Sequence, residues 1–382
     1  MTAPLDGITV VDLTHVLAGP YCTMILADLG ARVIKVERPE IGDDTRAFPP
    51  FDGGESAYFA AINRSKESIA LDLKAPEDRE IFEQIVAQSD VLVENYRPGV
   101  MDRLGFGWEA LHEKHPQLIY GVSSGFGHTG PETQKPCYDM VVQARSGVMS
   151  ITGEAGREPV RAGASIGDIV AGMFLAHGIL AALADRARSG AGRFVDVAML
   201  DGQLAILEHA IAIVGVTGEA PGPNGARHPS ITPFETFHAE DGLFVIAAGN
   251  DALFAKLCDL LELPGLTTNP KFNTNLARCE NHMLLKRLIE AVTLGAPKAH
   301  WIGALEAAGV PTGPIQNVAE ALQDPQIIAR NMVAKIPRPD GRFFGAAGNP
   351  IKMTGLEDPV VRAAAPSLDE HRAQILEWLA SA

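Results

Sequence analysis

The sequence of 382 residues has few cysteines and no long uninterrupted hydrophobic run. Its four cysteines stand far apart and form no CxxC pair, which excludes both a disulfide framework and a cysteine-based zinc site as expectations. The longest apolar stretch, residues 169–184, is broken by Gly172, His177 and Gly178. It is also shorter than the roughly 20 residues that a membrane span needs. We therefore expect no membrane segment and no bound metal.

The chain also lacks an excess of positive charge and a recognisable export signal. Its formal net charge of −15 repels nucleic acid and anionic membrane surfaces, so neither is expected as a partner. Residues 1–7 have no basic start and no apolar segment of the secretory type, and we expect a cytoplasmic protein. A polyanionic ligand would need a local cluster of basic residues against this global charge.

What the chain does contain is a regular alternation of short apolar runs and helical stretches. This alternation is typical of a parallel sheet with crossover helices. The expected strands are residues 8–13, 31–37, 68–73, 91–94 and 118–124, with helices at 21–29 and 76–89. We predict an α/β fold with a Rossmann-like doubly wound domain. A GxGxxG loop is missing after the first strand, which argues against a nicotinamide or flavin dinucleotide.

Composition divides the rest of the chain. A long helix at 168–188 and a strand at 194–199 complete the first part, and a stretch rich in glycine, proline and asparagine follows. Beyond it, a hairpin at 234–247 and helices at 252–261 and 281–294 suggest a smaller α+β domain. The expected organisation is a large domain at 1–215, a linker at 216–233, a small domain at 234–323 and a segment at 324–382 that returns to the large domain.

Candidate ligand-binding residues follow three of the expected strands. His15 comes after the first strand, just before a Gly-Pro turn, and Arg38 comes after the second. Tyr96 and Arg97 follow another strand. Ligands of open α/β sheets gather at the carboxyl ends of strands, and helix N-termini favour anions. The structural alternative for His15 is an ordinary strand-to-helix turn.

The basic residues near these strand ends suggest a phosphate-rich ligand. Arg38, Lys74, Arg97 and Arg103 are expected to converge on it, with Tyr96 beside an adenine or a pantetheine arm. The alternative is that these cations only balance an acidic surface.

Asp168 is the candidate catalytic residue. It follows Gly163 and Gly167 at the start of a long apolar helix, where glycine allows close approach of a ligand. The helix N-terminus is expected to keep its carboxylate ionised. The alternative is that Asp168 is an ordinary helix N-cap, which would explain the residue fully.

Taken together, these segments resemble the family III CoA-transferases, which include formyl-CoA transferase, carnitine CoA-transferase and the α-methylacyl-CoA racemases. The resemblance covers nearly the whole chain and rests on the ordered motifs THVLAGP (14–20), VIKVERP (33–39), NRSKES (63–68), VENYRPG (93–99) and GFGHTGP (125–131), together with Asp168 and the turn at 190–192.

The resemblance implies that Asp168 is a covalent nucleophile. Its carboxylate would attack an acyl-CoA thioester to give an anhydride, which the CoA thiolate converts into an aspartyl-CoA thioester. CoA would thus be a substrate, with no permanently bound cofactor, and the partner would be a second copy in an interlocked homodimer. The implied CoA-contacting residues are His15, Leu17, Ala18, Arg38, Leu71, Lys74, Asn95, Tyr96, Arg97, Arg103, Tyr138 and Asp139.

The chain departs from the family pattern at Leu17 and in its basic residue before the tyrosine pair, which is displaced to Lys135. Leu17 and the residue at 138 narrow the activity. Leu17 stands where formyl-CoA transferase has a glutamine, which argues against oxalate as the substrate. Tyr138 occupies the position of the racemase histidine, and a phenol with a pKa near 10 is poorly matched to moving an α-proton. Transfer is favoured. The alternatives are an α-methylacyl-CoA racemase or isomerase and a catalytically silent CoA-binding protein.

The middle of the chain most resembles the succinyl-CoA:glutarate transferase branch. That resemblance implies that the donor's acyl group and the acceptor both come from dicarboxylic acids. A panel of acceptor acids with succinyl-CoA tests this expectation. A second carboxylate would need a cation or a donor-rich backbone. The candidate substrate residues are Arg46, Arg227, His228, Gly249 and Asn250.

Overall fold

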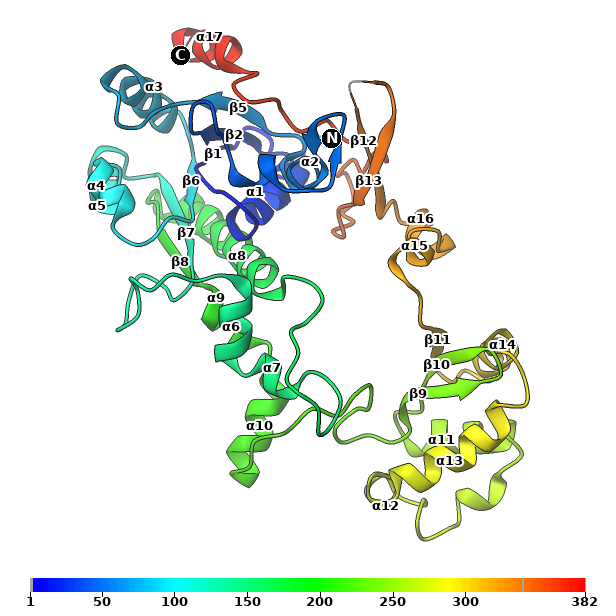
Figure 1. The fold of residues 1–382 in the computed structure, drawn as a ribbon. Helices are drawn as coiled ribbons and strands as arrows, with labels where there is room; N and C mark the ends of the chain where they lie inside the picture. Colours follow the sequence, from blue (N-terminus) through cyan, green and yellow to red (C-terminus); the bar gives the residue numbers. More distant parts are fainter. Residues whose placement is uncertain (1–2, 339, 382) are drawn as a thin grey trace. The chain divides into compact units, whose positions relative to one another are not determined.

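The computed structural model describes residues 3–338 and 340–381, which form two compact units (Figure 1). Unit 1 contains the chain up to Met149, Arg161–Glu219 and the chain from Asp324 onward. Unit 2 contains Ser150–Val160 and Ala220–Gln323. The expected boundaries had placed residues 150–160 in the large domain. In the structure these residues belong to unit 2, and the Gly225 amide of that unit donates a hydrogen bond of 2.8 Å to the Gly153 carbonyl.

Unit 1 is built on a six-stranded parallel sheet in the order β5-β2-β1-β6-β7-β8. Numbered along the chain, these strands follow the order 3-2-1-4-5-6 of the Rossmann fold, so the doubly wound α/β prediction is confirmed. The order reverses between β1 and β6. The strand bounds are β1 Thr9–Asp12, β2 Arg32–Glu37, β5 Glu67–Ala70, β6 Val91–Glu94, β7 Ile119–Ser124 and β8 Phe194–Ala198.

Helices cover both faces of this sheet because its strands bury side chains on alternate sides. On one face, Val10 of β1 shares a core with Leu26 of α1 (Ala18–Asp28) and Ile179 of α8 (Ile166–Ser189). On the other face, Val11 shares a core with Phe82 of α3 (Pro76–Ala87). The smaller helices of that side are α4 Val100–Leu104 and α5 Trp108–Lys114.

The C-terminal helix α17 (Arg372–Ser381) belongs to the same unit. It lies beside α3 and β5, and its Ile375 is fully buried in the core of that face (Figure 1). The last segment of the chain therefore returns to the large sheet. Two short hairpins also belong to unit 1, formed by β3 (Phe51–Asp52) with β4 (Glu55–Ser56) and by β12 (Val333–Pro337) with β13 (Phe343–Ala347).

Helix α8 is long and apolar enough to cross a membrane by length and composition alone, as is the bent pair α9 (Met199–Ala205) and α10 (Glu208–Thr217). In this fold α8 packs against α1, β7 and β8, and Leu175 and Ile179 on its inner side are fully buried. Its apolar character is thus used in covering the sheet. The absence of a membrane segment remains a prediction.

The remaining short helices are distributed along the rest of this part of the chain. They are η1 Asp44–Ala47, α2 Ala57–Asn63, α6 Asp139–Ser146, α7 Val148–Ile151 and α16 Pro325–Ala329. Ser56 caps α2 by accepting a hydrogen bond from the Phe59 amide.

Unit 2 is a small α+β unit with an antiparallel sheet in the order β11-β10-β9. The hairpin expected at 234–247 is present as β9 (Phe234–Ala239) and β10 (Gly242–Ala247), and β11 is Thr312–Pro314. Phe237, Phe244 and Leu285 anchor its core. Its helices are α11 Asp251–Leu260, η2 Pro264–Leu266, α12 Asn275–Glu280, α13 His282–Thr293, α14 Lys298–Ala307 and α15 Val318–Ala321.

Candidate functional site

The carboxyl ends of β1 and β6, where the strand order reverses, are joined by a side chain. The Asn95 carboxamide accepts a hydrogen bond from the His15 amide at 2.9 Å and donates one to the His15 carbonyl at 2.7 Å. It thereby continues the pairing of the two strands beyond their last backbone bonds. The loop that carries His15 is held at the place where open α/β sheets bind ligands.

The residue after His15 has a strained backbone. Val16 has a φ of +66°, a left-handed value that a β-branched side chain rarely adopts. Its amide donates to Asp43 Oδ1 at 3.2 Å, which helps to hold this conformation. Such strain persists only where the surroundings enforce it, and it clusters at functional sites. Here it directs the flanking residues His15 and Leu17 toward one cavity.

Beneath this loop lies a buried ionic network. Asp12 accepts from Lys66 at 2.9 Å, Lys35 pairs with Asp43 at 3.0 Å, and all four side chains are almost completely buried. Burial opposes ionisation of Asp12, but the nearby charges of Lys66 and Lys35 hold its pKa far below the usual range. The network fixes the loop after β1 to β2 and to the segment before β5.

A cavity of about 360 Å³ opens at these strand ends. Its walls come from the loops after β1, β6 and β7, from the segment before α6 and from the start of α8. The predicted site residues that line it are His15, Leu17, Ala18, Asn95, Tyr96, Arg97, Tyr138 and Asp168. The structure thus brings together residues that lie up to 153 positions apart in the chain.

A second cavity, of about 240 Å³, shares two lining residues with the first. His15 and Tyr96 line both cavities, and Arg38 lines the second, at the ends of β1 and β2. Arg38 pairs with Asp44 at 2.5 Å and keeps about half of its side chain exposed. A ligand long enough to pass His15 and Tyr96 can therefore extend from Asp168 toward Arg38.

Other predicted contact residues lie farther along the same edge of the sheet. Leu71 and Lys74 follow β5, the next strand beyond β2; Leu71 is buried in the core and Lys74 is exposed. Arg103 is exposed on α4, close to Gly99. These three residues are not among those that line the two cavities.

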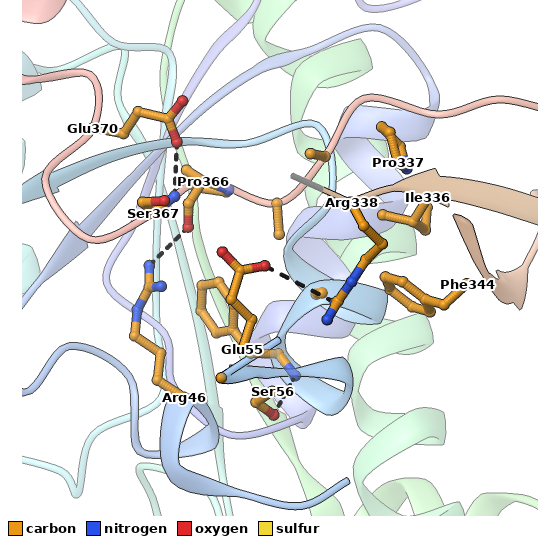
Figure 2. Close-up of a pocket in the computed structure, with 15 residues that line it drawn as sticks. Arg46, Glu55, Ser56, Ile336, Pro337, Arg338, Phe344, Pro366, Ser367 and Glu370 are labelled. Carbon is orange, nitrogen blue, oxygen red and sulfur yellow. Dashed lines mark hydrogen bonds and ion pairs between the residues drawn. The ribbon is translucent and has the colours of Figure 1, made fainter. Parts of the chain in front are cut away.

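Arg46 interacts with groups other than those of the cavity that Asp168 lines. Its guanidinium makes two hydrogen bonds of 2.7 Å to the Glu37 carboxylate and one of 3.1 Å to the Pro366 carbonyl. It lines a different cavity of about 400 Å³ (Figure 2). That cavity also includes Arg338 and Glu55, which point toward each other across it, 3.9 Å apart. The structure does not bring Arg46 into the cavity with Asp168.

The other predicted substrate residues belong to unit 2. The His228 amide donates to the Phe234 carbonyl at 2.9 Å, and the Phe234 end of β9 pairs with the Ala247 end of β10. Gly249 follows that end of β10, and Asn250 caps α11 through the Leu253 amide. Within unit 2, His228 and Gly249 thus lie near the same end of the β9–β10 hairpin, the end opposite its turn. Arg227 precedes His228 in a turn.

Asp168 lies in the first turn of α8, but it is not the N-cap. Ser165 occupies the cap position, three residues earlier, so the interpretation of Asp168 as an ordinary cap is wrong. Burial, and then the negative charge of Asp139, raise the pKa of Asp168 to about 7. Asp168 is therefore partly protonated near pH 7, because burial and Asp139 oppose the ionisation that a helix N-terminus favours.

Asp139 lies behind the turn that carries Asp168 and is not among the residues that line the cavity. At the start of α6, its Oδ1 accepts from the Gly167 amide and its Oδ2 accepts from Gln143 Nε2, both at 2.7 Å. A Cβ atom on Gly167 would lie 2.9 Å from Asp139 Oδ1 and 2.8 Å from Val142 Cγ2. Glycine at 167 is what lets the two segments approach so closely.

Residues near Asp168 that the sequence did not single out include Tyr58 and Cys137. Burial, and then the charge of Asp168, raise the pKa of Tyr58 to about 12 and that of Cys137 to about 11. Both groups are therefore neutral at pH 7. Cys137 lines the cavity beside Tyr138, whereas Tyr58 comes from α2 and packs against Phe48. No motif connects α2 with Asp168, so only the fold reveals Tyr58.

Glu94 is a further buried carboxyl group at the end of β6. Burial raises its pKa to about 8, although it accepts a 2.6 Å hydrogen bond from the Tyr96 amide. At neutral pH Glu94 is mainly protonated and supports the loop that carries Asn95 and Tyr96. Across residues 3–338 and 340–381, no group of three or more His, Cys, Asp or Glu side chains could hold a metal ion.

This arrangement suits nucleophilic chemistry on a long anionic ligand. Asp168 is half-buried, with a pKa close to neutrality, so a substantial fraction is ionised without full hydration. Arg97 and Arg38 lie at other points of the connected cavities, where they can neutralise phosphate groups.

Comparison with known proteins identifies the family. Acetyl-CoA:oxalate CoA-transferase from Acetobacter aceti is 49% identical over 379 residues, covering 99% of this chain and 96% of that protein. Succinyl-CoA:glutarate CoA-transferase from Homo sapiens is 38% identical over 375 residues, covering 98% of this chain and 85% of that protein. The crystal structure of a CaiB/BaiF family protein from Brucella suis matches with a TM-score of 0.87 and 40% identity, covering 99% of this chain and all of that one.

The match to the family extends over almost the whole chain, since residues 5–372 fit the sequence profile of CoA-transferase family III. The motifs around His15, Asn95 and Asp168 line the cavity described above, in a fold shared with solved relatives. The chain is therefore an enzyme that belongs to CoA-transferase family III.

Proposed function

We propose that this enzyme transfers CoA from an acyl-CoA to a free dicarboxylic acid through covalent esters of Asp168. The observation that carries the proposal is the position of Asp168 in a cavity that also holds His15, Asn95 and Arg97, with a carboxyl pKa near 7. A partly desolvated carboxylate is a better nucleophile than a fully hydrated one.

The reaction is a sequence of four carbonyl substitutions. The Asp168 carboxylate attacks the donor thioester, the C–S bond breaks, and CoA leaves as a thiolate from the resulting anhydride. The thiolate then attacks the aspartyl carbonyl and releases the donor acid as a carboxylate. The acceptor carboxylate attacks the aspartyl-CoA thioester, the C–S bond breaks, and CoA leaves as a thiolate while a second anhydride forms. The thiolate finally attacks the acceptor's acyl carbon in this anhydride, which releases the Asp168 carboxylate. Water must be excluded because it would hydrolyse each ester.

CoA is proposed to run along the carboxyl ends of the strands. The pantetheine end would lie against Leu17, Ala18 and Asn95, next to Asp168. The remainder would pass His15 and Tyr96 toward Arg38, since these residues connect the two cavities. Lys74, exposed after the neighbouring strand β5, is proposed to meet the far end of CoA, whereas the Leu71 side chain is buried and could contact it only through its backbone. Tyr138, which is 76% exposed at the cavity, is available to cover the bound ester.

The acid pair is proposed from the relatives. Those compared above are named for oxalate and glutarate, and a further relative from Haloarcula hispanica, 42% identical, is named for mesaconate. All three acceptors are dicarboxylates. The donor is proposed to be succinyl-CoA or another dicarboxylyl-CoA, with acetyl-CoA as the competing donor. The 49% identical relative also restores oxalate as an acceptor candidate, against the expectation drawn from Leu17.

The working form is proposed to be an interlocked homodimer. Helix α10 is strongly apolar but buries none of its side chains within the chain, and Val216 is 87% exposed. Met173 and Phe174 of α8 are also exposed. Such apolar helical surface is typical of subunit interfaces. A cytoplasmic location is proposed alongside, and the four free thiols are consistent with it.

A panel of acids tests the proposed activity. The purified enzyme is incubated with succinyl-CoA or acetyl-CoA and with oxalate, glutarate, mesaconate or butyrate, and the CoA esters are followed by mass spectrometry. The proposal expects a dicarboxylyl-CoA product and little butyryl-CoA. A preference for butyrate would contradict it, and α-proton exchange with solvent deuterium in the absence of any acceptor would instead support a racemase.

A further inference from the structure

Gln203 is a buried carboxamide that has no hydrogen-bond partner. It lies in α9, one helical turn beyond Met199, which lines the cavity beside Asp168. Its side chain has no exposed surface, and among the residues that the structure describes neither its Oε1 nor its Nε2 is hydrogen-bonded. Buried polar groups without partners are uncommon in folded proteins and usually have a specific reason.

The neighbouring buried carboxamide behaves differently. Gln143 of α6 is equally buried, but its Nε2 donates to Asp139 at 2.7 Å and its Oε1 accepts from the Ala162 amide at 2.8 Å. Burial of an amide in this layer is thus compatible with complete hydrogen bonding. Of these two buried glutamines, only Gln203 has a carboxamide with both polar atoms unpartnered.

The unpartnered Gln203 amide lies beside Gly167, in the turn that carries Asp168. A Cβ atom placed on Gly167 would lie 3.6 Å from Gln203 Nε2 and 2.9 Å from Asp139 Oδ1. The donor and the carboxylate oxygen therefore border the same point above the residue that precedes Asp168. Helix α9 packs directly against both α6 and α8, so the flexible Gln203 side chain lies in the same layer as the Asp139 carboxylate.

We infer that Gln203 is a positioning residue for the nucleophile, whose Nε2 turns to donate to the Asp139 carboxylate when Asp168 is ionised. The inference rests on the proposed role of Asp168. In the free enzyme two carboxylates face each other across the Gly167 turn, and a donor to Asp139 weakens their repulsion. In the aspartyl-CoA ester Asp168 carries no charge, and the donor is no longer needed. Gln203 thus follows the change of charge during each turnover.

Other titratable groups around this pair are few. Arg161, from the segment before α8, lies 4.0 Å from Asp139 and is nearly half exposed. Tyr58 of α2 and Cys137 of the cavity wall interact with Asp168, but both are neutral near pH 7. Asp43 and Arg145 are further charged groups of this region, since they act on Tyr58 and Cys137 respectively. Gln203 is the buried donor beside Gly167 that has no partner.

The test uses the full-length enzyme with Gln203→Leu, a change that keeps the volume and removes the amide, and Gln143→Leu as the matched control. Because the Gln203 amide is unsatisfied in the resting structure, Gln203→Leu is expected to keep or raise Tm. Its kcat is expected to fall roughly 10-fold to 100-fold, the scale of a misplaced catalytic group. The acid limb of its kcat/KM pH profile should move to higher pH. Gln143→Leu should lower Tm, because it breaks two hydrogen bonds.

An unchanged kcat and pH profile in Gln203→Leu would overturn the inference, as would a loss of activity that merely parallels a loss of Tm. Asp168→Asn, measured in parallel, separates the two proposals. If Asp168→Asn still forms a hydroxylamine-sensitive ester, the proposed mechanism fails. If Asp168→Asn is inactive while Gln203→Leu behaves as the wild type, only the role of Gln203 fails.

Discussion

The backbone amide of Gly167 donates a 2.7 Å hydrogen bond to Asp139 Oδ1, which places a second carboxylate directly behind the turn that carries Asp168. The bond ties the start of α6 to the start of α8. It also sets the electrostatics of the site, because Asp139 adds to burial in raising the pKa of Asp168. This contact therefore affects both the position of Asp168 and, together with burial, its charge.

The first prediction concerns pH. Asp168 must be ionised to attack, so kcat/KM should fall as the pH drops through about 7. Asp139→Asn removes a negative charge that favours the protonated form, and the pKa of Asp168 should decrease. The acid limb of the kcat/KM profile should therefore move to lower pH, measured with succinyl-CoA between pH 5 and 9. A profile that stays in place would show that Asp139 does not act on the nucleophile.

The second prediction concerns the space above Gly167. Gly167→Ala places a methyl group 2.9 Å from Asp139 Oδ1 and 2.8 Å from Val142 Cγ2, so the turn must shift. Displacement of the nucleophile by about 1 Å is expected to lower kcat roughly 100-fold. The control is Gly163→Ala, where the new atom meets no neighbour within 4 Å. Equal kcat values for both variants would refute a role for the Gly167 contact.

The third prediction concerns stability against pH. Glu94 has a folded-state pKa of about 8 against an ordinary value of 4.5, so the folded protein holds a proton that the unfolded chain releases. The contribution of Glu94 to stability therefore decreases as the pH rises from about 4.5 to 8. Glu94→Gln retains an acceptor for the Tyr96 amide but cannot ionise. Its Tm advantage over the wild type should grow between pH 5 and 9, whereas a constant difference would show that Glu94 does not titrate in that range.

The fourth prediction concerns the buried ionic network. Lys66→Met removes the cation that pairs with Asp12 and leaves the buried carboxylate without this partner. Such a change is expected to lower the free energy of unfolding by about 3–5 kcal/mol. Lys114→Met breaks an exposed pair with Glu83 and should cost less than about 1 kcal/mol. Urea unfolding of both variants measures the contrast. Similar small losses would mean that the network does not fix the loop after β1.

Much of the fold was predictable from the sequence because its signals are local. The strand at 91–94 matches β6 because a short continuous apolar run marks a strand buried on both faces. The hairpin at 234–247 matches β9 and β10 because its strands alternate and meet at a clear turn. The strand-end motifs also predicted which loops meet, and His15, Asn95 and Tyr96 line one cavity. Parallel topology forces the carboxyl ends of these strands together.

The rest of the site depends on contacts that no local pattern encodes. Asp139 and Gly167 are separated by 28 positions, so the sequence suggested a CoA contact where the structure has a support for the nucleophile. The ion pair of Arg46 with Glu37 likewise arises from packing of η1 against the end of β2. The raised pKa of Asp168 could not be predicted, because a helix terminus can be read from the sequence, whereas desolvation requires the fold.

The most direct test of the central claim is mass spectrometry of the enzyme after mixing with succinyl-CoA and without an acceptor acid. The account predicts a covalent CoA adduct on the peptide that contains Asp168, removed by hydroxylamine and absent from Asp168→Asn. An adduct on another peptide, or full transfer activity in Asp168→Asn, would contradict it.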